Sequence, residues 1–268
     1  MLNIHKTAII EEGAQIGNNV SIGPYSIIGP NVVLHDDIVI KSHVVIEGHT
    51  TIGRNTTIYQ FSSIGSPTQD LKYKGEKSEL IIGKNNIIRE YVTMNPGTDF
   101  GTKTIVGNNC LFMVGAHVAH DCIVGDYVIF ANNATLGGHV EVDDYAILGG
   151  LSAVIQFTKV GKHSMIGGLS GVRADVPPYA TVNPEYPKID GVNLVGLKRR
   201  DFTREQIKNL KYSYEILFSH NSLMSESIKE IDRKFGNCTA VQHLLSFLKL
   251  ESKKGLVKHK NFHANVKT

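Results

Sequence analysis

The sequence predicts a mainly β protein, in which a parallel β-helix of hexapeptide repeats precedes a small α-helical domain. Three observations carry this prediction. An aliphatic residue recurs at every sixth position, glycine often follows it, and a helical spacing of apolar residues replaces this period near the C-terminus. A period of six fits neither the 3.6 residues of a helix turn nor the alternation of an ordinary strand. It fits one short strand followed by one turn.

The repeat keeps a single phase from Ile4 to Val172. Glycine at the following position tolerates a turn in which a Cβ would clash. Three units make one triangular coil of about 18 residues, and coils stack about 4.8 Å apart, the spacing of hydrogen-bonded strands. A β-sandwich with accidental spacing is the alternative. The apolar positions of the repeat are Ile4, Ile10, Ile16, Ile22, Ile28, Leu34, Ile40, Ile46, Ile52, Ile58, Ile64, Ile82, Ile88, Met94, Val106, Phe112, Val118, Val124, Phe130, Leu136, Val142, Leu148, Val154, Val160, Ile166 and Val172.

Two polar, turn-rich stretches interrupt the repeat, at residues 66–81 and 95–105. We expect both to project from the coil as loops. Loops on a rigid scaffold often carry binding residues, although insertions without a role are the alternative.

The repeat ends near residues 175–187, because the two consecutive prolines there cannot continue ladder pairing. Helical spacing follows, and Thr203 with Gln206 forms the pattern of a capping box. We expect a basic tail from residue 251 to be exposed to solvent. The predicted helices cover residues 203–218, 225–235 and about 239–250. The predicted domains are therefore the β-helix, residues 1–190, and the helical domain, residues 191–268.

The composition limits the partners. A net charge of +3 is too small to indicate nucleic-acid binding. No apolar run approaches the roughly 20 residues that a spanning helix needs, and no leader precedes the repeat, so no membrane insertion is expected. Three widely spaced cysteines argue against a disulfide framework and favour a reducing compartment. We therefore expect a cytoplasmic protein.

The apolar stretch 112–130 carries two histidines and an aspartate, His117, His120 and Asp121. His139 follows His120 by one coil plus one residue, so it should lie on the adjacent coil, on the same side of the prism.

Three interpretations of this cluster are open. The side chains could be polar residues hydrated on a prism face, or they could bind zinc between subunits. In the third interpretation, a histidine is a general base that takes a proton from a sugar hydroxyl as the hydroxyl attacks an acyl thioester. A backbone N–H, for example that of Gly138, would then stabilise the oxyanion.

Five motifs, "AHVAHDC", "ANNATLGGHV", "QDLKY", "GLSGVRADVPPY" and "GVNLVGLKRRDFTRE", together resemble the acyl-carrier-protein:UDP-N-acetylglucosamine O-acyltransferase family over nearly the whole chain. This family catalyses the first step of lipid A synthesis in Gram-negative bacteria. The repeat alone is shared by many transferases, so the motifs carry the resemblance. It implies a left-handed β-helix and a homotrimer with active sites between subunits. It also implies transfer of a 3-hydroxyacyl group from acyl carrier protein to the 3-hydroxyl of UDP-N-acetylglucosamine, without a cofactor or metal.

The resemblance assigns His120 as the general base, Asp121 as its acidic neighbour and Gly138 as the oxyanion-hole glycine. Met165 and Gly168 match the far end of an acyl groove, where glycine leaves room for a longer chain; core packing and a turn are their alternatives. The positions that match substrate-binding residues are Gln69, Asp70, Lys72, His117, His139, Gln156, Asn193, Arg199 and Arg200.

The chain departs from the family pattern at four positions. Asn95, Ile155 and Tyr186 stand where the family has histidine, and Val195 where it often has glutamate. These positions affect the expected contacts to the nucleotide and the sugar. They also affect the expected choice between the usual sugar and its 3-amino analogue, and the choice of acyl chain.

Two other functions are compatible with the motifs. One is the sister N-acyltransferase of UDP-3-O-acylglucosamine, which normally has an additional N-terminal uridine-binding domain, for which no space precedes Ile4. The other is a non-catalytic protein that binds a nucleotide sugar.

Overall fold

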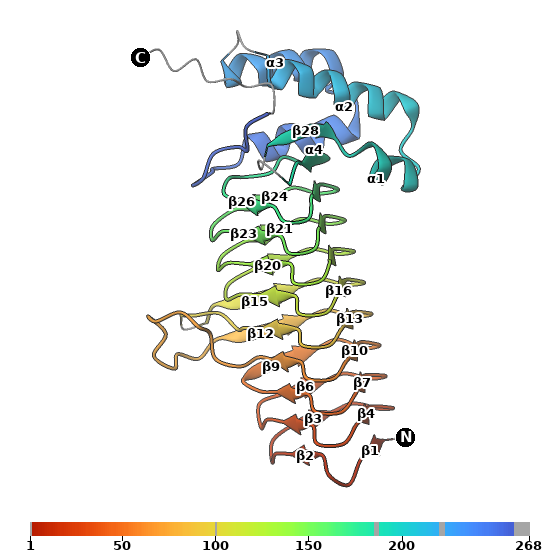
Figure 1. The fold of residues 1–268 in the computed structure, drawn as a ribbon, viewed down its shortest axis with the longest axis vertical. Helices are drawn as coiled ribbons and strands as arrows, with labels where there is room; N and C mark the ends of the chain where they lie inside the picture. The colour runs from red at the N-terminus through yellow and green to blue at the C-terminus, as the bar shows by residue number, and fades with distance from the viewer. Residues whose placement is uncertain (1, 100, 185–187, 220–222, 260–268) are drawn as a thin grey trace.

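The computed structural model describes residues 2–99, 101–184, 188–219 and 223–259. Over these residues the chain winds into a three-sided prism, and helices cover its C-terminal end (Figure 1). The expected left-handed parallel β-helix is confirmed. Of the helices in this part of the chain, none is both long and apolar enough to span a bilayer.

Three sheets, here called A, B and C, form the faces of the prism, and consecutive strands of the chain fall on successive faces. Within the described ranges sheet A has 11 strands: β1 (Asn3–Ile4), β4 (Ser21–Ile22), β7 (Val39–Ile40), β10 (Thr57–Ile58), β13 (Ile87–Ile88), β16 (Leu111–Phe112), β19 (Ile129–Phe130), β22 (Ile147–Leu148), β25 (Met165–Ile166), β27 (Ala180–Val182) and β28 (Ile189–Val192). Sheet B has nine in the same part of the chain: β2 (Ile9–Ile10), β5 (Ile27–Ile28), β8 (Val45–Ile46), β11 (Ser63–Ile64), β14 (Thr93–Met94), β17 (His117–Val118), β20 (Thr135–Leu136), β23 (Ala153–Val154) and β26 (Gly171–Val172). Sheet C has eight there: β3 (Gln15–Ile16), β6 (Val33–Leu34), β9 (His49–Ile52), β12 (Glu79–Ile82), β15 (Lys103–Val106), β18 (Ile123–Val124), β21 (Glu141–Val142) and β24 (Lys159–Val160).

Most strands have two residues, and the second of them is the aliphatic residue of the repeat. From β4 onwards its side chain is buried in the prism, as for Ile28, Ile46 and Val118, which are 0% exposed. In the first coil Ile4 is exposed and Ile10 and Ile16 are half-buried. The first residue of each two-residue strand faces outward. The prism core is therefore a column of aliphatic side chains, widened by Phe112 and Phe130, whose ring centroids are 4.8 Å apart.

The three edges of the prism are formed by turns in which one residue adopts a positive φ angle. Most of these residues are not glycine, although the left-handed conformation costs an L-residue about 1–2 kcal/mol. Contacts with the equivalent residue of the next coil offset this cost. On the edge between sheets C and A, for example, Asn55 donates to Asn85 at 3.0 Å, and the rings of Tyr127 and Tyr145 stack at 4.8 Å.

Both predicted loops lie on the edge between sheets B and C, and they project from the prism near its middle (Figure 1). Outside the loops, paired strands are one coil apart, as Val39 and Thr57 are. Across the loops the separation grows, because Thr57 pairs with Ile87 and Ile87 pairs with Leu111. The two insertions are both multiples of the six-residue repeat, and so the phase of the repeat survives them. Their last residues belong to strands β12 and β15.

The C-terminal helices within the described residues are α1 (Leu194–Arg199), α2 (Arg204–Leu217), α3 (Met224–Phe235) and α4 (Thr239–Leu248). The predicted capping box at the start of α2 is confirmed. The Thr203 hydroxyl accepts from Gln206 N–H at 3.1 Å, and the Gln206 side chain accepts from Thr203 N–H at 2.8 Å. The sequence analysis did not predict α1. The proline-rich stretch also holds β27, which continues sheet A, and the antiparallel strand β28 then follows.

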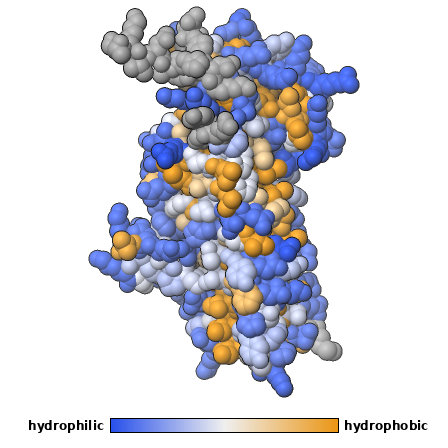
Figure 2. Space-filling view, viewed as in Figure 1, coloured by the Kyte–Doolittle hydropathy of each residue, from blue (hydrophilic) through white to orange (hydrophobic). Residues whose placement is uncertain are grey.

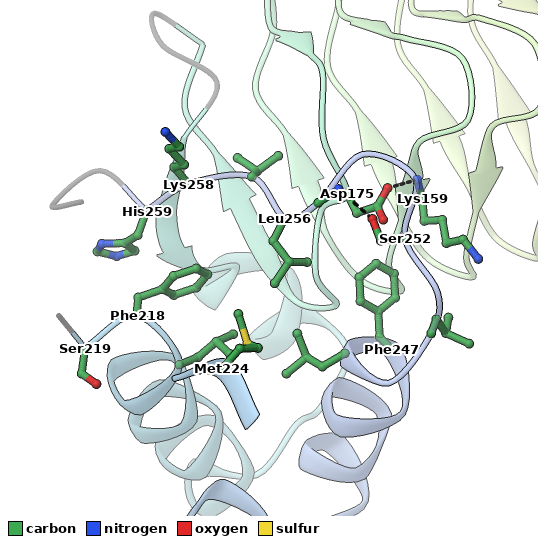
Figure 3. Close-up of a pocket in the computed structure, with 15 residues that line it drawn as sticks. Lys159, Asp175, Phe218, Ser219, Met224, Phe247, Ser252, Leu256, Lys258 and His259 are labelled. Carbon is green, nitrogen blue, oxygen red and sulfur yellow. Dashed lines mark hydrogen bonds between the residues drawn. The ribbon is translucent and has the colours of Figure 1, made fainter. Parts of the chain in front are cut away.

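The segment after α4 returns to the prism. The expectation of a solvated tail is confirmed for residues 251–253, 255 and 258, which are exposed, and is wrong for Val257, which is buried. Asp175 N–H donates to Gly255 O at 2.7 Å, Val257 N–H donates to Asp175 O at 2.9 Å, and Val257 is buried. We call residues 249–257 the C-terminal strap. Between the strap and helices α2, α3 and α4 lies an apolar cavity of about 470 Å³, lined by Phe218, Met224 and other apolar side chains (Figure 3). None of the predicted site residues lines it.

His163 sits on the edge between sheets C and A, and its ring stacks between Tyr145 and Tyr179 at 4.7 and 5.5 Å. Burial, followed by the charges of Arg200 and Lys162, lowers the pKa of His163 to about 4. The unfolded chain binds this proton near pH 6.5, whereas the folded chain binds it only near the lowered pKa. Stability from this residue is therefore complete above about pH 6.5 and falls as the pH drops towards about 4.

We predict that His163→Phe, which keeps an aromatic ring in the stack, reduces the acid sensitivity of the fold. The loss of unfolding free energy between pH 7.5 and 4.5 should be smaller than in the wild type by about 2–3 kcal/mol per chain. Denaturant unfolding followed by circular dichroism at one protein concentration measures this difference. His43→Phe, which replaces an exposed ring, is the control, and equal acid losses in wild type and His163→Phe would contradict the prediction.

Candidate active site

The predicted catalytic residues gather on the edge between sheets B and C. The turn from β17 to β18 carries His120 and Asp121, and the turn from β20 to β21 carries Gly138 and His139. His139 N–H donates to His120 O at 2.9 Å, so the two turns are fixed one above the other. The two projecting loops leave the prism from the same edge, one and two coils closer to the N-terminus.

His120 and Asp121 form a hydrogen-bonded pair. His120 Nδ1 lies 2.9 Å from Asp121 Oδ2, and the side chains are only 12% and 7% exposed. A carboxylate only accepts, so Nδ1 carries the proton, and Nε2 is left with a lone pair. The Thr98 hydroxyl also donates to Asp121 Oδ2, at 2.7 Å.

The surroundings of Asp121 favour its charged form. Burial alone would raise the pKa of this carboxyl, but hydrogen bonds from His120, Thr98 and Thr102, with the charge of His139, outweigh burial and lower the pKa. An ionised Asp121 fixes the tautomer of His120 and would stabilise an imidazolium if Nε2 took a proton.

Gly138 is required by the position of His120. A Cβ at residue 138 would lie 2.2 Å from His120 Cε1, far inside van der Waals contact. Its carbonyl accepts from Phe157 N–H at 3.1 Å, and its N–H donates to no acceptor within the described ranges of the chain. An uncommitted N–H beside the imidazole fits the predicted oxyanion hole.

The first projecting loop brings Asp70 to the base within a single chain. Asp70 Oδ2 lies 3.8 Å from His120 Nε2, and Asp70 Oδ1 accepts from Lys72 N–H at 2.9 Å. The side chains of Gln69 and Lys72 are exposed. Asn95, one of the departures, is buried, and its amide donates to Ser66 O at 3.0 Å, so this residue ties the two projecting loops together.

His139 is held by a column of stacked groups. Its ring meets the ring of His120 edge-on at 5.2 Å and stacks on Phe157 at 4.6 Å. The ammonium of Lys253, in the C-terminal strap, lies 4.7 Å from the centre of the Phe157 ring. His139 Nε2 lies 3.7 Å from Asp121 Oδ2. The strap therefore supports the site through two aromatic rings.

Thr98, Phe157 and Lys253 were not expected at this site from the sequence. Phe157 carried a usable signal, because it follows His139 by one full coil of the repeat. Thr98 and Lys253 carried no such sequence signal, because neither the path of the projecting loop nor the return of the C-terminal strap follows the six-residue repeat.

Three further predicted positions lie on or beside sheet B. His117 faces outward from β17, and its Nδ1 is 2.7 Å from the Thr93 hydroxyl. Burial, followed by the charge of His120, lowers the pKa of His117. Gln156 and Ile155 follow β23, and both are exposed. These residues continue the site onto the outer face of sheet B.

The predicted nucleotide-binding residues lie elsewhere in the chain. The guanidinium carbon of Arg200 is 5.0 Å from the ring centre of Tyr145, on the edge between sheets C and A. Arg199 is the last residue of α1. The Asn193 side chain caps α1, accepting from Gly196 N–H at 3.0 Å and donating to His163 O at 3.0 Å. One chain therefore does not bring these residues to His120.

The remaining predicted positions are placed as follows. Met165 faces outward from β25 on sheet A, and Gly168 lies near the edge between sheets A and B, where a Cβ would be 3.1 Å from Gly150 O. Val195 is exposed in α1. Tyr186 lies outside the described residues.

The thiol beside the His120–Asp121 pair is poorly suited to act as a nucleophile. Burial raises the pKa of the Cys122 thiol to about 12, and its Sγ donates to Gly137 O at 3.2 Å. A direct reaction between two bound substrates therefore fits the site better than a covalent thioester on the enzyme. His120, Asp121 and His139 each offer one atom that could bind a metal, and these atoms lie within 4.8 Å of one another.

Comparison with known proteins agrees with this site and fold. A family model described as UDP N-acetylglucosamine O-acyltransferase, domain 2, matches residues 175–257, and the bacterial transferase hexapeptide model matches residues 3–36, 13–48 and 103–138. The acyl-[acyl-carrier-protein]–UDP-N-acetylglucosamine O-acyltransferase of Rickettsia rickettsii (strain Sheila Smith) is 55% identical over 251 residues, which cover 93% of this chain and 95% of that protein.

Solved structures give the same result. The UDP-N-acetylglucosamine acyltransferase of Francisella novicida superposes with a TM-score of 0.90 at 39% identity, covering 96% of this chain and 95% of that one. The enzyme of Bacteroides fragilis 9343 gives 0.91 at 36% identity, covering 95% and 99%. The family and the enzymatic character expected from the motifs are confirmed, and this chain belongs to the acyl-[acyl-carrier-protein]–UDP-N-acetylglucosamine O-acyltransferases.

Proposed function

We propose that this protein transfers a 3-hydroxyacyl group from acyl carrier protein to the 3-hydroxyl of UDP-N-acetylglucosamine, the first step of lipid A synthesis, with His120 as the general base. One observation carries the assignment of the base. His120 Nδ1 is bound to the buried Asp121 at 2.9 Å, so Nε2 is the ring nitrogen that accepts a proton. The name of the Rickettsia rickettsii relative contains the same two substrates.

The reaction proceeds without a covalent enzyme intermediate. Nε2 of His120 takes the proton of the sugar 3-hydroxyl as its oxygen bonds to the thioester carbonyl carbon. The N–H of Gly138 stabilises the negative charge that forms on the carbonyl oxygen. The carbon–sulfur bond then breaks, and the thiolate of the carrier takes the proton from His120. The products are an O-acyl sugar nucleotide and the free carrier thiol, and the base returns to its neutral form.

Asp70 marks where the acceptor hydroxyl binds. Its carboxylate is 3.8 Å from His120 Nε2, beyond a direct hydrogen bond. A hydroxyl placed between them would donate to Nε2 and lie beside the carboxylate. Gln69 and Lys72, from the same loop, are exposed beside this point and are suited to the polar groups of the nucleotide sugar.

A homotrimer completes the site. Asn193, Arg199 and Arg200 lie on a different edge from His120, so they reach the nucleotide of a site only if that site lies between neighbouring chains. The exposed surface supports such packing, because Leu71 in the first projecting loop is fully exposed. Figure 2 shows hydrophobic patches along the prism and one on the projecting loop. On the edge between sheets A and B the exposed apolar residues are Tyr25, Phe61, Tyr91, Leu151 and Leu169.

The acyl groove also requires residues from two chains. Met165 and Gly168 lie on and beside the outer face of sheet A, away from His120 of the same chain. They line the acyl chain in a site to which two chains contribute. Gly168 leaves space above Gly150 that a side chain would fill, which suits a longer acyl chain.

We predict that His120→Ala lowers kcat by about a hundredfold or more, because a positioned base contributes factors of about 10²–10⁴. Mass spectrometry of products from mixed acyl-carrier thioesters and UDP-N-acetylglucosamine measures the loss, separates ester from amide, and gives the chain length. The oligomeric state, measured by light scattering, should remain unchanged. Near-normal turnover in the variant would refute the base, and an amide product from an amino-sugar acceptor alone would indicate the N-acyltransferase.

We predict that Thr98→Val lowers kcat by about fivefold to tenfold with little change in KM, because it removes the hydroxyl that donates to Asp121 at 2.7 Å while keeping the side-chain shape. Steady-state kinetics on the full-length protein measures the change. Thr51→Val, on the outer face of sheet C, is the matched control. An unaltered kcat in Thr98→Val would show that Asp121 does not depend on this loop.

A further inference from the structure

The atoms that organise the proposed base are also arranged to bind a transition-metal ion. His120 Nδ1 and Asp121 Oδ2 are 2.9 Å apart, and His139 Nε2 and Asp121 Oδ2 are 3.7 Å apart. Ligand atoms about 2.0–2.2 Å from a tetrahedral Zn²⁺ are separated by about 3.3 Å, and the two observed distances lie on either side of this value. His120, Asp121 and His139 each offer one ligand atom, and these ligand atoms lie within 4.8 Å of one another.

The backbone and the second layer of contacts hold this arrangement. The two histidines lie on adjacent coils joined by the hydrogen bond from His139 N–H to His120 O. Thr98 orients the carboxylate from one side, and Phe157 supports the His139 ring from the other. Such outer contacts fix ligand orientation in metal sites. His139 is 39% exposed, so an ion has access from solvent.

We propose that this cluster is an inhibitory site for Zn²⁺, with His120 Nδ1, Asp121 Oδ2 and His139 Nε2 as the protein ligands and water as the fourth. Two imidazoles and one carboxylate select zinc and its neighbours in the first transition series over Mg²⁺ and Ca²⁺, which prefer oxygen ligands. The inhibition rests on the proposed role of His120, whereas the binding of the ion does not.

The chemistry of the imidazole explains why the bound ion would stop the reaction. Nδ1 binds a metal through the lone pair that it lacks when it donates to Asp121. The neutral ring must therefore carry its single proton on Nε2 instead. A protonated Nε2 has no lone pair with which to accept the proton of the sugar hydroxyl. The metal thus switches off the base by selecting the other tautomer.

Binding is tested first, without reference to activity. Metal-free, full-length protein is titrated with Co²⁺, and we expect the visible absorption of tetrahedral Co²⁺ to saturate at one ion per chain and to disappear when Zn²⁺ is added. His139→Asn should weaken binding by about tenfold or more. Cys238→Ser, which removes a partly exposed thiol, is the control and should bind as the wild type does. No absorption in the wild type, or equal affinity in wild type and His139→Asn, would overturn the proposed site.

Inhibition is tested on the same preparations, with each rate normalised to that of the same variant without metal. We expect Zn²⁺ at site saturation to lower the rate of acyl transfer by about tenfold or more, and we expect chelation of the ion to restore the rate. The reason is that a positioned general base accelerates the reaction by at least that factor. The Zn²⁺ concentration for half inhibition should rise in His139→Asn and stay constant in Cys238→Ser. Full activity with the site occupied would overturn the inhibitory role. Co²⁺ binding without acyl transfer in any metal-free preparation would refute the proposed function and leave the metal site standing.

Discussion

The stacking of one coil on the next in a fixed register is the constraint on which the rest of this structure depends. Within the coils, each strand pairs in parallel with its equivalent on the next coil, and the hydrogen bonds between coils leave no freedom to slip. A slip of one residue would turn the aliphatic side chains outward and the polar ones into the core. Every position of the repeat therefore lies above its equivalent on the next coil. Side chains at equivalent positions of successive turns consequently lie side by side and can form one site.

The candidate active site uses this property directly. Asp121, His139 and Phe157 are equivalent residues of three successive turns, and all three have a positive φ angle. The left-handed backbone at these turns is costly for residues with a side chain, but stacking and hydrogen bonds along the edge offset the cost. His120 lies one position before Asp121 and fills the space that the missing side chain of Gly138 leaves. The proposed base is thus positioned by the regular geometry of the coil, whereas Thr98 and Asp70 are added by loops.

The same regularity separates groups that one chain cannot bring together. The proposed base faces one edge, the arginines another, and the acyl-groove residues lie on and beside sheet A. A rigid prism has no hinge by which these groups could approach one another, so under the proposed function association of chains is the route to a complete site. The C-terminal strap links the helical cap to the edge between sheets B and C, because Lys253 covers the ring on which His139 stacks.

The sequence by itself determined the coiled fold, the register of one coil on the next, and which residues gather on the edge between sheets B and C. The period of six names the buried residues, and a separation of about one coil places His120, Asp121 and His139 together before any coordinates are seen. The family motifs predicted His120 as the base and Gly138 as the oxyanion-hole glycine. Only the tertiary structure decided the contacts made by residues outside the six-residue repeat. These are the hydrogen bond from Thr98 to Asp121, the approach of Asp70 to His120, and the hydrogen bond through which Asn95 joins the two loops. The tertiary structure also decided helix α1 and the return of the C-terminal strap to the prism. A repeat fixes contacts between equivalent positions, because their spacing is constant. The path of a loop or a chain end depends on side-chain contacts between residues with no fixed separation, so no sequence period encodes it.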